Sequence, residues 1–267
     1  MPYIEVNDAW LYYEEHGKGK ETIVFGHGMM FNLRMFDDQV AALKANYRCV
    51  LFDFRGQGKS GVTSDGYDLD NLAVDVSALI KELKCEPCHF VGFSMGGIVA
   101  MRIAYRYPEL LKSLLLIDTS SEPDPDTGQF RNKMMLWVAK NIGLKPVANK
   151  VISMLFGPAF LKDPERKELR SSWKKHFLSN SRTGIVHAVQ GVFARTGITD
   201  ILPKIEVPTL ILWGDQDDLT DREKAEIMNK NIKNSELRII PRAGHMSPVE
   251  EPEKVNDLII EFLNKLQ

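Results

Sequence analysis

The chain has 267 residues, of which 44% are hydrophobic and 26% charged, and its formal net charge is −2. This is the composition of one large globular domain, and it lacks the basic excess of a nucleic-acid-binding protein. The N-terminus has no basic stretch followed by an apolar one, and no apolar run is long enough to span a membrane. We therefore expect a cytoplasmic protein with neither nucleic acid nor a membrane as partner.

The first 120 residues alternate predicted strands and helices. Short apolar runs predict strands at residues 3–6, 10–16, 22–25, 48–52, 88–91 and 114–117, with a hairpin joining the first two. Apolar residues at helical spacing predict helices at residues 36–46, 69–83 and 96–107. This alternation predicts an α/β fold with a mostly parallel central sheet and helices on both faces.

One short segment inside this pattern indicates catalytic chemistry. Residues 92–96 read Gly-Phe-Ser-Met-Gly and lie between a predicted buried strand and a predicted helix. The pattern Gly-x-Ser-x-Gly is typical of a nucleophile elbow, a strained turn that holds a serine hydroxyl clear of the backbone. The glycines let the strand and the helix pack closely. Ser94 is therefore a candidate nucleophile, and the alternative is an ordinary surface hydroxyl.

The middle of the chain breaks the alternation. Residues 122–128 are rich in Pro and Asp and predict a turn-rich boundary. Helical stretches without any strand pattern follow at residues 130–142, 145–155, 164–178 and 183–193. Strand and helix alternation resumes at Val207.

Two more candidate residues, Asp217 and His245, each follow a short apolar strand near the C-terminus. The chain order Ser, Asp, His, with each residue just past a strand, is that of the α/β-hydrolase arrangement. Other carboxylates could replace Asp217 as the acid of this set. The alternatives are Asp118, Asp215 and Asp218.

Five motifs together resemble the α/β-hydrolase-fold superfamily, in its capped serine esterase, lactonase and cofactor-free haloperoxidase type. They are His27-Gly28-Met29, the Asp-Phe-Arg-Gly-Gln-Gly-Lys-Ser run at 53–60, residues 92–97, residues 214–217 and Gly244-His245. Within this superfamily, the chain most resembles 3-oxoadipate enol-lactonases and small carboxylesterases. The resemblance implies an α/β-hydrolase core at residues 1–120 and 204–267, and a helical cap, or lid, at residues 121–203.

The resemblance also assigns roles to the candidate residues. Ser94 would attack a carbonyl carbon, His245 would act as general base, and Asp217, selected by the family spacing Gly-x-x-Asp, would orient the histidine. The oxyanion hole would use the backbone N–H groups of Met95, the residue after the nucleophile, and Met29. His27 is expected to brace the loop that carries Met29.

These residues lead us to expect a serine hydrolase that cleaves a small carboxylic ester or lactone through an acyl-enzyme. The alternatives are a carbon–carbon bond hydrolase of the same fold and a ligand-binding receptor without catalysis. Apolar side chains near the site and in the cap are expected to line the substrate pocket, because methionine and aromatic residues adapt to apolar ligands. They are Met30, Phe93, Met134 and Trp137.

No cofactor and no metal are expected. Residues 85–89 match the haem pattern Cys-x-x-Cys-His, but Cys88 and His89 open the strand that leads to Ser94, so His89 is expected to be buried in the sheet. The Gly-x-Gly at residues 56–58 lacks the remainder of a phosphate-binding motif. No cluster of His, Cys and carboxylate residues has the spacing of metal ligands.

Overall fold

The computed structural model describes residues 2–123 and 130–267, so most of the expected turn-rich boundary at residues 122–128 lies outside the described part. Eight strands are present in it. They are β1 (Tyr3–Val6), β2 (Ala9–His16), β3 (Thr22–Gly26), β4 (Arg48–Phe52), β5 (Cys88–Phe93), β6 (Leu111–Ile117), β7 (Thr209–Gly214) and β8 (Ser235–Ile240).

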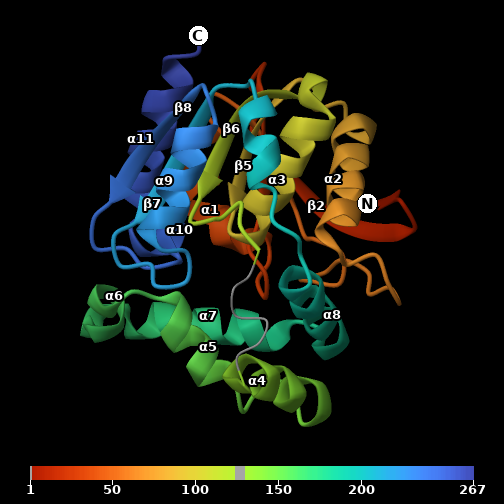
Figure 1. The fold of residues 1–267 in the computed structure, drawn as a ribbon, viewed down its shortest axis with the longest axis vertical. Coiled ribbons are helices and arrows are strands. Elements are labelled where there is room, and N and C mark those ends of the chain that lie inside the picture. Colours follow the sequence, from red (N-terminus) through yellow and green to blue (C-terminus); the bar gives the residue numbers. More distant parts are fainter. Residues whose placement is uncertain (1, 124–129) are drawn as a thin grey trace.

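The strands form a single sheet in the order β1-β2-β4-β3-β5-β6-β7-β8 (Figure 1). β1 pairs with β2 and β2 pairs with β4 in antiparallel fashion, and the strands from β3 to β8 are parallel. The hairpin turns at Asn7 and Asp8, which both have positive φ, as the favoured two-residue hairpin turn requires. The predicted α/β fold with a mostly parallel sheet is confirmed.

Helices lie between the strands and cover both faces of the sheet. Their bounds are α1 (Asp37–Leu43), α2 (Leu69–Glu82), α3 (Met95–Arg106), α4 (Phe130–Asn141), α5 (Ala148–Leu155), α6 (Pro158–Lys162), α7 (Lys167–Ser179), α8 (Arg182–Phe193), α9 (Arg222–Asn231), α10 (Ser247–Glu250) and α11 (Pro252–Asn264). Short 3₁₀ helices occur as η1 (Leu33–Phe36), η2 (Pro108–Leu110), η3 (Pro164–Arg166) and η4 (Thr199–Lys204).

Alternate residues of each central strand point to opposite faces of the sheet. In β6, Leu115 and Ile117 belong to the cluster that includes α1 and α11, whereas Leu114 and Leu116 belong to the cluster that includes α2, α3 and α9. Both clusters exclude water, so β6 is apolar at four consecutive positions, 114–117, rather than at alternate ones. This two-sided burial explains why the central strands read as continuous apolar runs in the sequence.

The helices α4 to α8, which we call the cap, lie together below the sheet in Figure 1. They follow β6 and precede β7 in the chain. Two glycines of the cap region contact the backbone of the sheet layer directly. A Cβ added to Gly184 would lie 1.8 Å from the Gly56 carbonyl oxygen, and one added to Gly157 would lie 2.7 Å from the Gly244 nitrogen. Glycine is therefore needed at both contacts.

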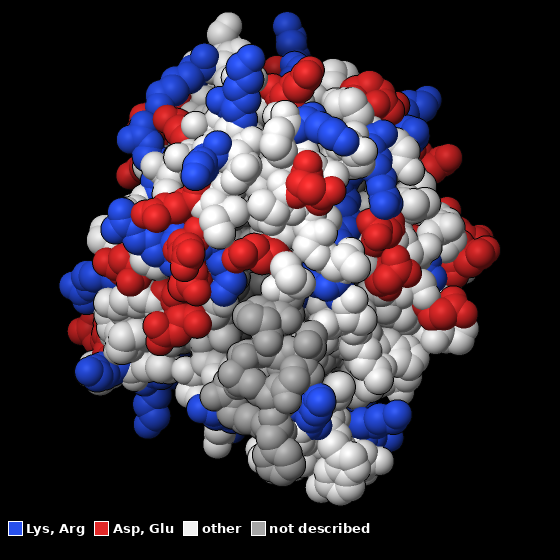
Figure 2. Space-filling model, viewed as in Figure 1, with Lys and Arg blue, Asp and Glu red and all other residues white. Residues whose placement is uncertain are grey.

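The surface shows no single dominant charge on the face in view. Acidic and basic side chains are interspersed over it in Figure 2. Among the described residues, no helix has the length and apolar character needed to cross a membrane.

The contact between α3 and the sheet is equally close, and it places Ser94. A Cβ added to Gly96 would lie 2.1 Å from the carbonyl oxygen of Gly26, the last residue of β3, and one added to Gly92 would lie 2.6 Å from the Gly96 carbonyl oxygen. The two glycines of the elbow motif are therefore required by the packing of α3 against β3 and β5.

We predict that Gly96→Ala lowers the free energy of unfolding by about 3 kcal/mol, because the added methyl group would overlap a backbone oxygen that cannot move aside. Gly61→Ala is the control, since its Cβ would meet its nearest neighbour at 3.4 Å, an ordinary contact. Urea denaturation of the two variants measures the difference. Equal stability of the two variants would contradict the close packing described for α3.

Candidate active site

Ser94 lies at a strained turn between β5 and α3. Its φ of 50° and ψ of −117° are values that a residue with a side chain rarely adopts. Two hydrogen bonds hold this conformation: the Ser94 N–H donates to the Ile117 carbonyl at 2.9 Å, and the Thr119 hydroxyl donates to the Ser94 carbonyl at 2.7 Å. Both partners lie at the end of the neighbouring strand β6, so the sheet itself fixes the turn.

The structure brings Ser94, His245 and Asp217 into one hydrogen-bonded chain. The distance from Ser94 Oγ to His245 Nε2 is 3.0 Å, and that from His245 Nδ1 to Asp217 Oδ2 is 2.8 Å. His245 and Asp217 are buried, being 5% and 3% exposed. The three residues follow β5, β8 and β7, so the arrangement arises because the carboxyl ends of parallel strands meet at one edge of the sheet.

Asp217 is fixed by more than the histidine. Its Oδ1 accepts the N–H groups of Leu219 at 2.8 Å and Thr220 at 3.0 Å, and its Oδ2 accepts the Thr220 hydroxyl. The carboxylate therefore has defined partners on both oxygens. Thr220 is not among the site residues expected from the sequence, although its position three residues after Asp217 is a local signal for such a turn.

Asp217 and His245 each stabilise the charged form of the other. Burial alone would lower the pKa of His245, but the carboxylate of Asp217 beside it raises that pKa above 6.5. Burial alone would raise the pKa of Asp217, but the His245 charge and the hydrogen bonds from His245 and Thr220 lower it below 3.8. The Asp217 carboxylate therefore stabilises the positive charge that His245 acquires when it takes up a proton.

The three alternative acids occupy other positions. Asp118 is buried and accepts the Gly214 N–H at 2.8 Å and the Ser247 hydroxyl. Burial, together with nearby Asp217, raises the pKa of Asp118 well above its usual range. Asp215 accepts the N–H of Arg242, and Asp218 lines the pocket. Of these four carboxylates, Asp217 is the one that hydrogen-bonds to His245.

The two expected oxyanion donors, Met29 and Met95, lie close to the nucleophile. Met95 is the first residue of α3, where a backbone N–H has no partner within the helix. Met29 follows Gly28, whose added Cβ would lie 3.3 Å from Ser94 Cβ. Among the hydrogen bonds of the described residues, none uses the N–H of Met29 or of Met95, so both remain available to a developing negative charge.

His27 holds the Met29 loop. Its Nδ1–H donates to the Gly28 carbonyl at 2.7 Å, and its Nε2 accepts the Phe54 N–H at 3.0 Å. Burial lowers the pKa of His27 to about 4, so the ring is neutral near pH 7, as one donating and one accepting nitrogen require. Because carbonyl and N–H point in opposite directions across a trans peptide, this bond also fixes the direction of the Met29 N–H.

A cavity of about 340 Å³ opens at Ser94 and His245, between the sheet edge and the cap. The expected residues Met30 and Phe93 line it. The expectation for Met134 and Trp137 is wrong, because these side chains are 49% and 59% exposed on the outer side of α4 and do not line the cavity. The side of α4 that faces the cavity instead presents Met135, Leu136 and Ala139.

A buried carboxylate that the sequence analysis did not consider, Glu250, joins the cap to the His245 loop. It accepts the N–H of Gly157, at the start of α6, at 3.0 Å and the N–H of Met246, next to His245, at 3.2 Å. Burial raises the pKa of Glu250 to about 7. Its position five residues after His245 gives no signal of this role, because the partner Gly157 is distant in the chain.

The described residues contain no group of three or more His, Cys, Asp or Glu side chains that could hold a metal ion. The cysteines of the haem-like pattern, Cys85 and Cys88, are buried and free. His89 is buried in the sheet, as expected, with its Nδ1 2.8 Å from the Ser113 hydroxyl.

The family of the chain follows from comparison with known proteins. The family model described as "alpha/beta hydrolase fold" matches residues 21–252, which include all five motifs. The chain belongs to the α/β-hydrolase fold family. The order of Ser94, Asp217 and His245 along this chain is that of the catalytic residues in that fold.

Several relatives resemble the chain over nearly its whole length. A putative non-heme chloroperoxidase of Synechocystis sp. is 32% identical, covering 98% of this chain and 100% of the relative. 3-Oxoadipate enol-lactonase 2 of Acinetobacter baylyi is 26% identical over 96% of this chain and 94% of its own. The solved structure of a thermophilic esterase from Thermogutta terrifontis superposes with a TM-score of 0.91, at 29% identity over 99% of this chain and 98% of that one.

We predict that Glu250 makes stability fall as pH rises from about 4.5 to about 7. The folded pKa of about 7 lies above the ordinary value of 4.5, so the folded protein holds the proton more tightly than the unfolded one, and stability is lost as that proton leaves. The loss for a shift of this size is up to about 3 kcal/mol. Urea denaturation between pH 4.5 and 8 should show a shallower decline for Glu250→Gln than for the wild type.

The control variant is Glu253→Gln, a side-chain change on the neighbouring helix α11 at an exposed position. It should keep the wild-type pH dependence. A Glu250→Gln curve parallel to the wild-type curve over the whole range would contradict the burial of a protonated Glu250.

Proposed function

We propose that this protein is a serine hydrolase that cleaves a small carboxylic ester or lactone through an acyl-enzyme on Ser94. The observation that carries the proposal is the chain of hydrogen bonds from Ser94 Oγ to His245 Nε2 at 3.0 Å and from His245 Nδ1 to Asp217 Oδ2 at 2.8 Å. A serine hydroxyl is a weak nucleophile near neutral pH, and a base at this distance can remove its proton as it attacks.

In the first half of the reaction, Ser94 Oγ attacks the substrate carbonyl carbon while His245 Nε2 takes the hydroxyl proton. The carbonyl oxygen becomes an oxyanion, which the N–H groups of Met29 and Met95 stabilise. The carbon–oxygen bond of the ester then breaks, and His245 returns its proton to the leaving alkoxide. The products are an alcohol and an acyl group bound to Ser94.

In the second half, water attacks the acyl carbon while His245 again takes a proton. The bond from that carbon to Ser94 Oγ breaks, the histidine returns the proton to the serine, and a carboxylic acid leaves. In a lactone the alcohol and the acid are parts of one molecule, so the product is a single hydroxy acid. Asp217 keeps the histidine in the required tautomer throughout and stabilises its charged form.

The lining of the cavity supports an apolar acyl group as the substrate. Behind Ser94 the cap contributes aliphatic and aromatic side chains, among them Val147, Val151, Phe177 and Val189. The volume of about 340 Å³ is at the lower end of the range for small-molecule sites, about 300–1,000 Å³. Relatives named as an esterase and as an enol-lactonase are in keeping with these substrate classes.

We predict that the protein hydrolyses p-nitrophenyl esters from acetate to octanoate, and that Ser94→Ala loses at least about 10⁴-fold in kcat. Release of p-nitrophenol is the measurement, with a small lactone assayed in parallel by acid release. Ser153→Ala, an exposed serine on α5, should match the wild type. Full activity of folded Ser94→Ala would exclude the acyl-enzyme, and an inert wild type would favour carbon–carbon bond hydrolysis or ligand binding.

We predict an acid limb in the pH profile of kcat/KM with an apparent pKa above 6.5, because Asp217 raises the pKa of the base His245. Asp217→Asn should lower kcat by about 10⁴-fold and move this limb to lower pH, since the negative partner is lost. Asp215→Asn, at the neighbouring turn, should keep the wild-type limb. A limb unmoved in Asp217→Asn would show that another group titrates.

A further inference from the structure

Three successive peptide groups beside Ser94 are each held by one buried side chain. The first, between Gly28 and Met29, is held by His27 through the Gly28 carbonyl. In the second, between Met29 and Met30, the Met30 N–H donates to Gln57 Oε1 at 2.7 Å. In the third, between Met30 and Phe31, the Met30 carbonyl accepts from Asn180 Nδ2 at 3.0 Å.

This loop needs such support because its backbone is strained. Met30 has a φ of 74°, in the left-handed region that a methionine rarely occupies. Rotation of either peptide next to Met30 would relieve this strain. The Met29–Met30 peptide shares the Met29 Cα with the peptide that carries the Met29 N–H, so such a rotation would shift the position of that N–H relative to the reacting carbonyl. The side chains of Gln57 and Asn180 are 1% and 7% exposed, so water does not compete for these hydrogen bonds.

Asn180 comes from the cap and not from the sheet layer. It directly follows the last residue of α7. Its Nδ2 group also lies 3.0 Å from the His176 carbonyl, so the helix itself holds the amide in place. Its Oδ1 accepts the Gly58 N–H at 2.8 Å, in the same turn that carries Gln57. These partners fix which end of the amide donates, because Gly58 offers an N–H and Met30 offers a carbonyl.

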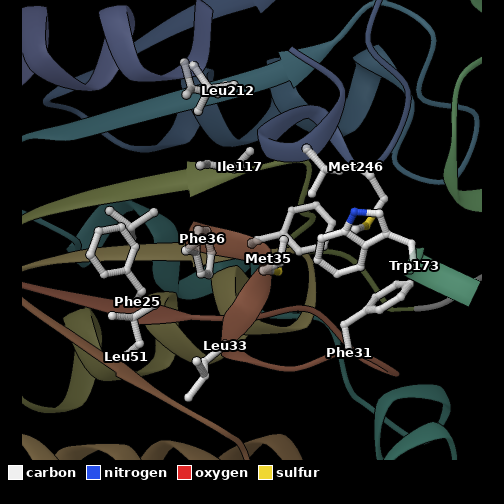
Figure 3. Packing of buried hydrophobic residues seen from close by; sticks show 14 of the residues in the cluster. Phe25, Phe31, Leu33, Met35, Phe36, Leu51, Ile117, Trp173, Leu212 and Met246 are labelled. Atoms are coloured by element: carbon white, nitrogen blue, oxygen red, sulfur yellow. The ribbon is translucent and has the colours of Figure 1, made fainter. Parts of the chain in front are cut away.

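A second contact joins the same cap helix to the loop. Trp173 of α7 packs edge-on against Phe31, with ring centroids 5.3 Å apart and planes at 83° (Figure 3). Phe31 is fully buried and directly follows Met30. The helix α7 therefore contacts this loop through one hydrogen bond and one aromatic pair, on consecutive residues.

We propose that Asn180 and Gln57 are positioning residues for acyl transfer, which act through the Met30 peptide groups to aim the Met29 N–H at the oxyanion. The inference rests on the proposed function and extends it: the cap supports transition-state stabilisation in addition to enclosing the substrate. Docking of α7 and formation of the oxyanion hole are then one event, so a displaced cap lowers the chemical rate as well as the affinity for substrate.

Two variants each remove one of the hydrogen bonds to the Met30 peptide groups. Asn180→Asp keeps the acceptor for Gly58 and loses the donor to Met30, so we expect kcat to fall about 10- to 100-fold with KM changed less than about threefold, somewhat less than loss of a whole oxyanion donor. Gln57→Leu removes the acceptor for the Met30 N–H, so kcat should fall as in Asn180→Asp. Asn149→Asp, at an exposed position on α5, is the control for an added charge in the cap.

A second readout does not depend on turnover. Amide hydrogen exchange of residues 28–33 should accelerate in Asn180→Asp and in Gln57→Leu, and should stay at the wild-type rate in Asn149→Asp. Labelling of Ser94 by a fluorophosphonate tests the proposed function separately. An unlabelled, inactive wild type would overturn the proposed function. The exchange data would then still test whether Asn180 and Gln57 hold the loop.

Three results would overturn the positioning role. One is a kcat for folded Asn180→Asp that equals the wild type, which would mean that Asn180 only docks the cap through Gly58. Another is a rise in KM at constant kcat, which would place Asn180 in substrate binding. Unchanged exchange of residues 28–33 in both donor-loss and acceptor-loss variants would show that the loop holds its conformation without them.

Discussion

The candidate site depends above all on the close contact between the start of α3 and the end of β3. Gly96 lies so near the Gly26 carbonyl that any side chain there would overlap it. Ser94 directly precedes α3, and the loop that carries Met29 begins directly after Gly26, so this one contact sets the distance between the nucleophile and its proposed oxyanion donor. The strain of the turn at Ser94 is tolerated because the surrounding sheet is packed on both faces.

Around this contact, buried polar side chains join loops that come from distant parts of the chain. Asp118 connects the end of β7 to the His245 loop, because it accepts hydrogen bonds from the Gly214 N–H and the Ser247 hydroxyl. Glu250 connects the same loop to the cap. Each buried carboxylate costs free energy unless its oxygens are hydrogen-bonded, and in both cases backbone or hydroxyl donors supply those bonds. The geometry of the site is thus maintained by groups that need not touch the substrate.

Sequence patterns predicted those features that depend on local spacing. The strands, the elbow and the positions of Asp217 and His245 each follow from a short apolar run and the residues just after it. The orientation of α4 does not follow from the sequence, because residues 134–138 are apolar on every side of the helix. Their apolar character predicts Met134 and Trp137 in the pocket, although both side chains are exposed. The bond from Asn180 to Met30 joins residues 150 positions apart, and no local pattern reports such a contact.

The most direct test of the account is mass spectrometry of the protein quenched during turnover of a p-nitrophenyl ester, followed by peptide mapping. If Ser94 is the nucleophile, an adduct of the acyl mass forms on the peptide that contains Ser94, at the rate of the initial p-nitrophenol burst. Steady turnover of the ester with an acyl group on another residue, or with no covalent adduct under conditions where deacylation limits the rate, would contradict it.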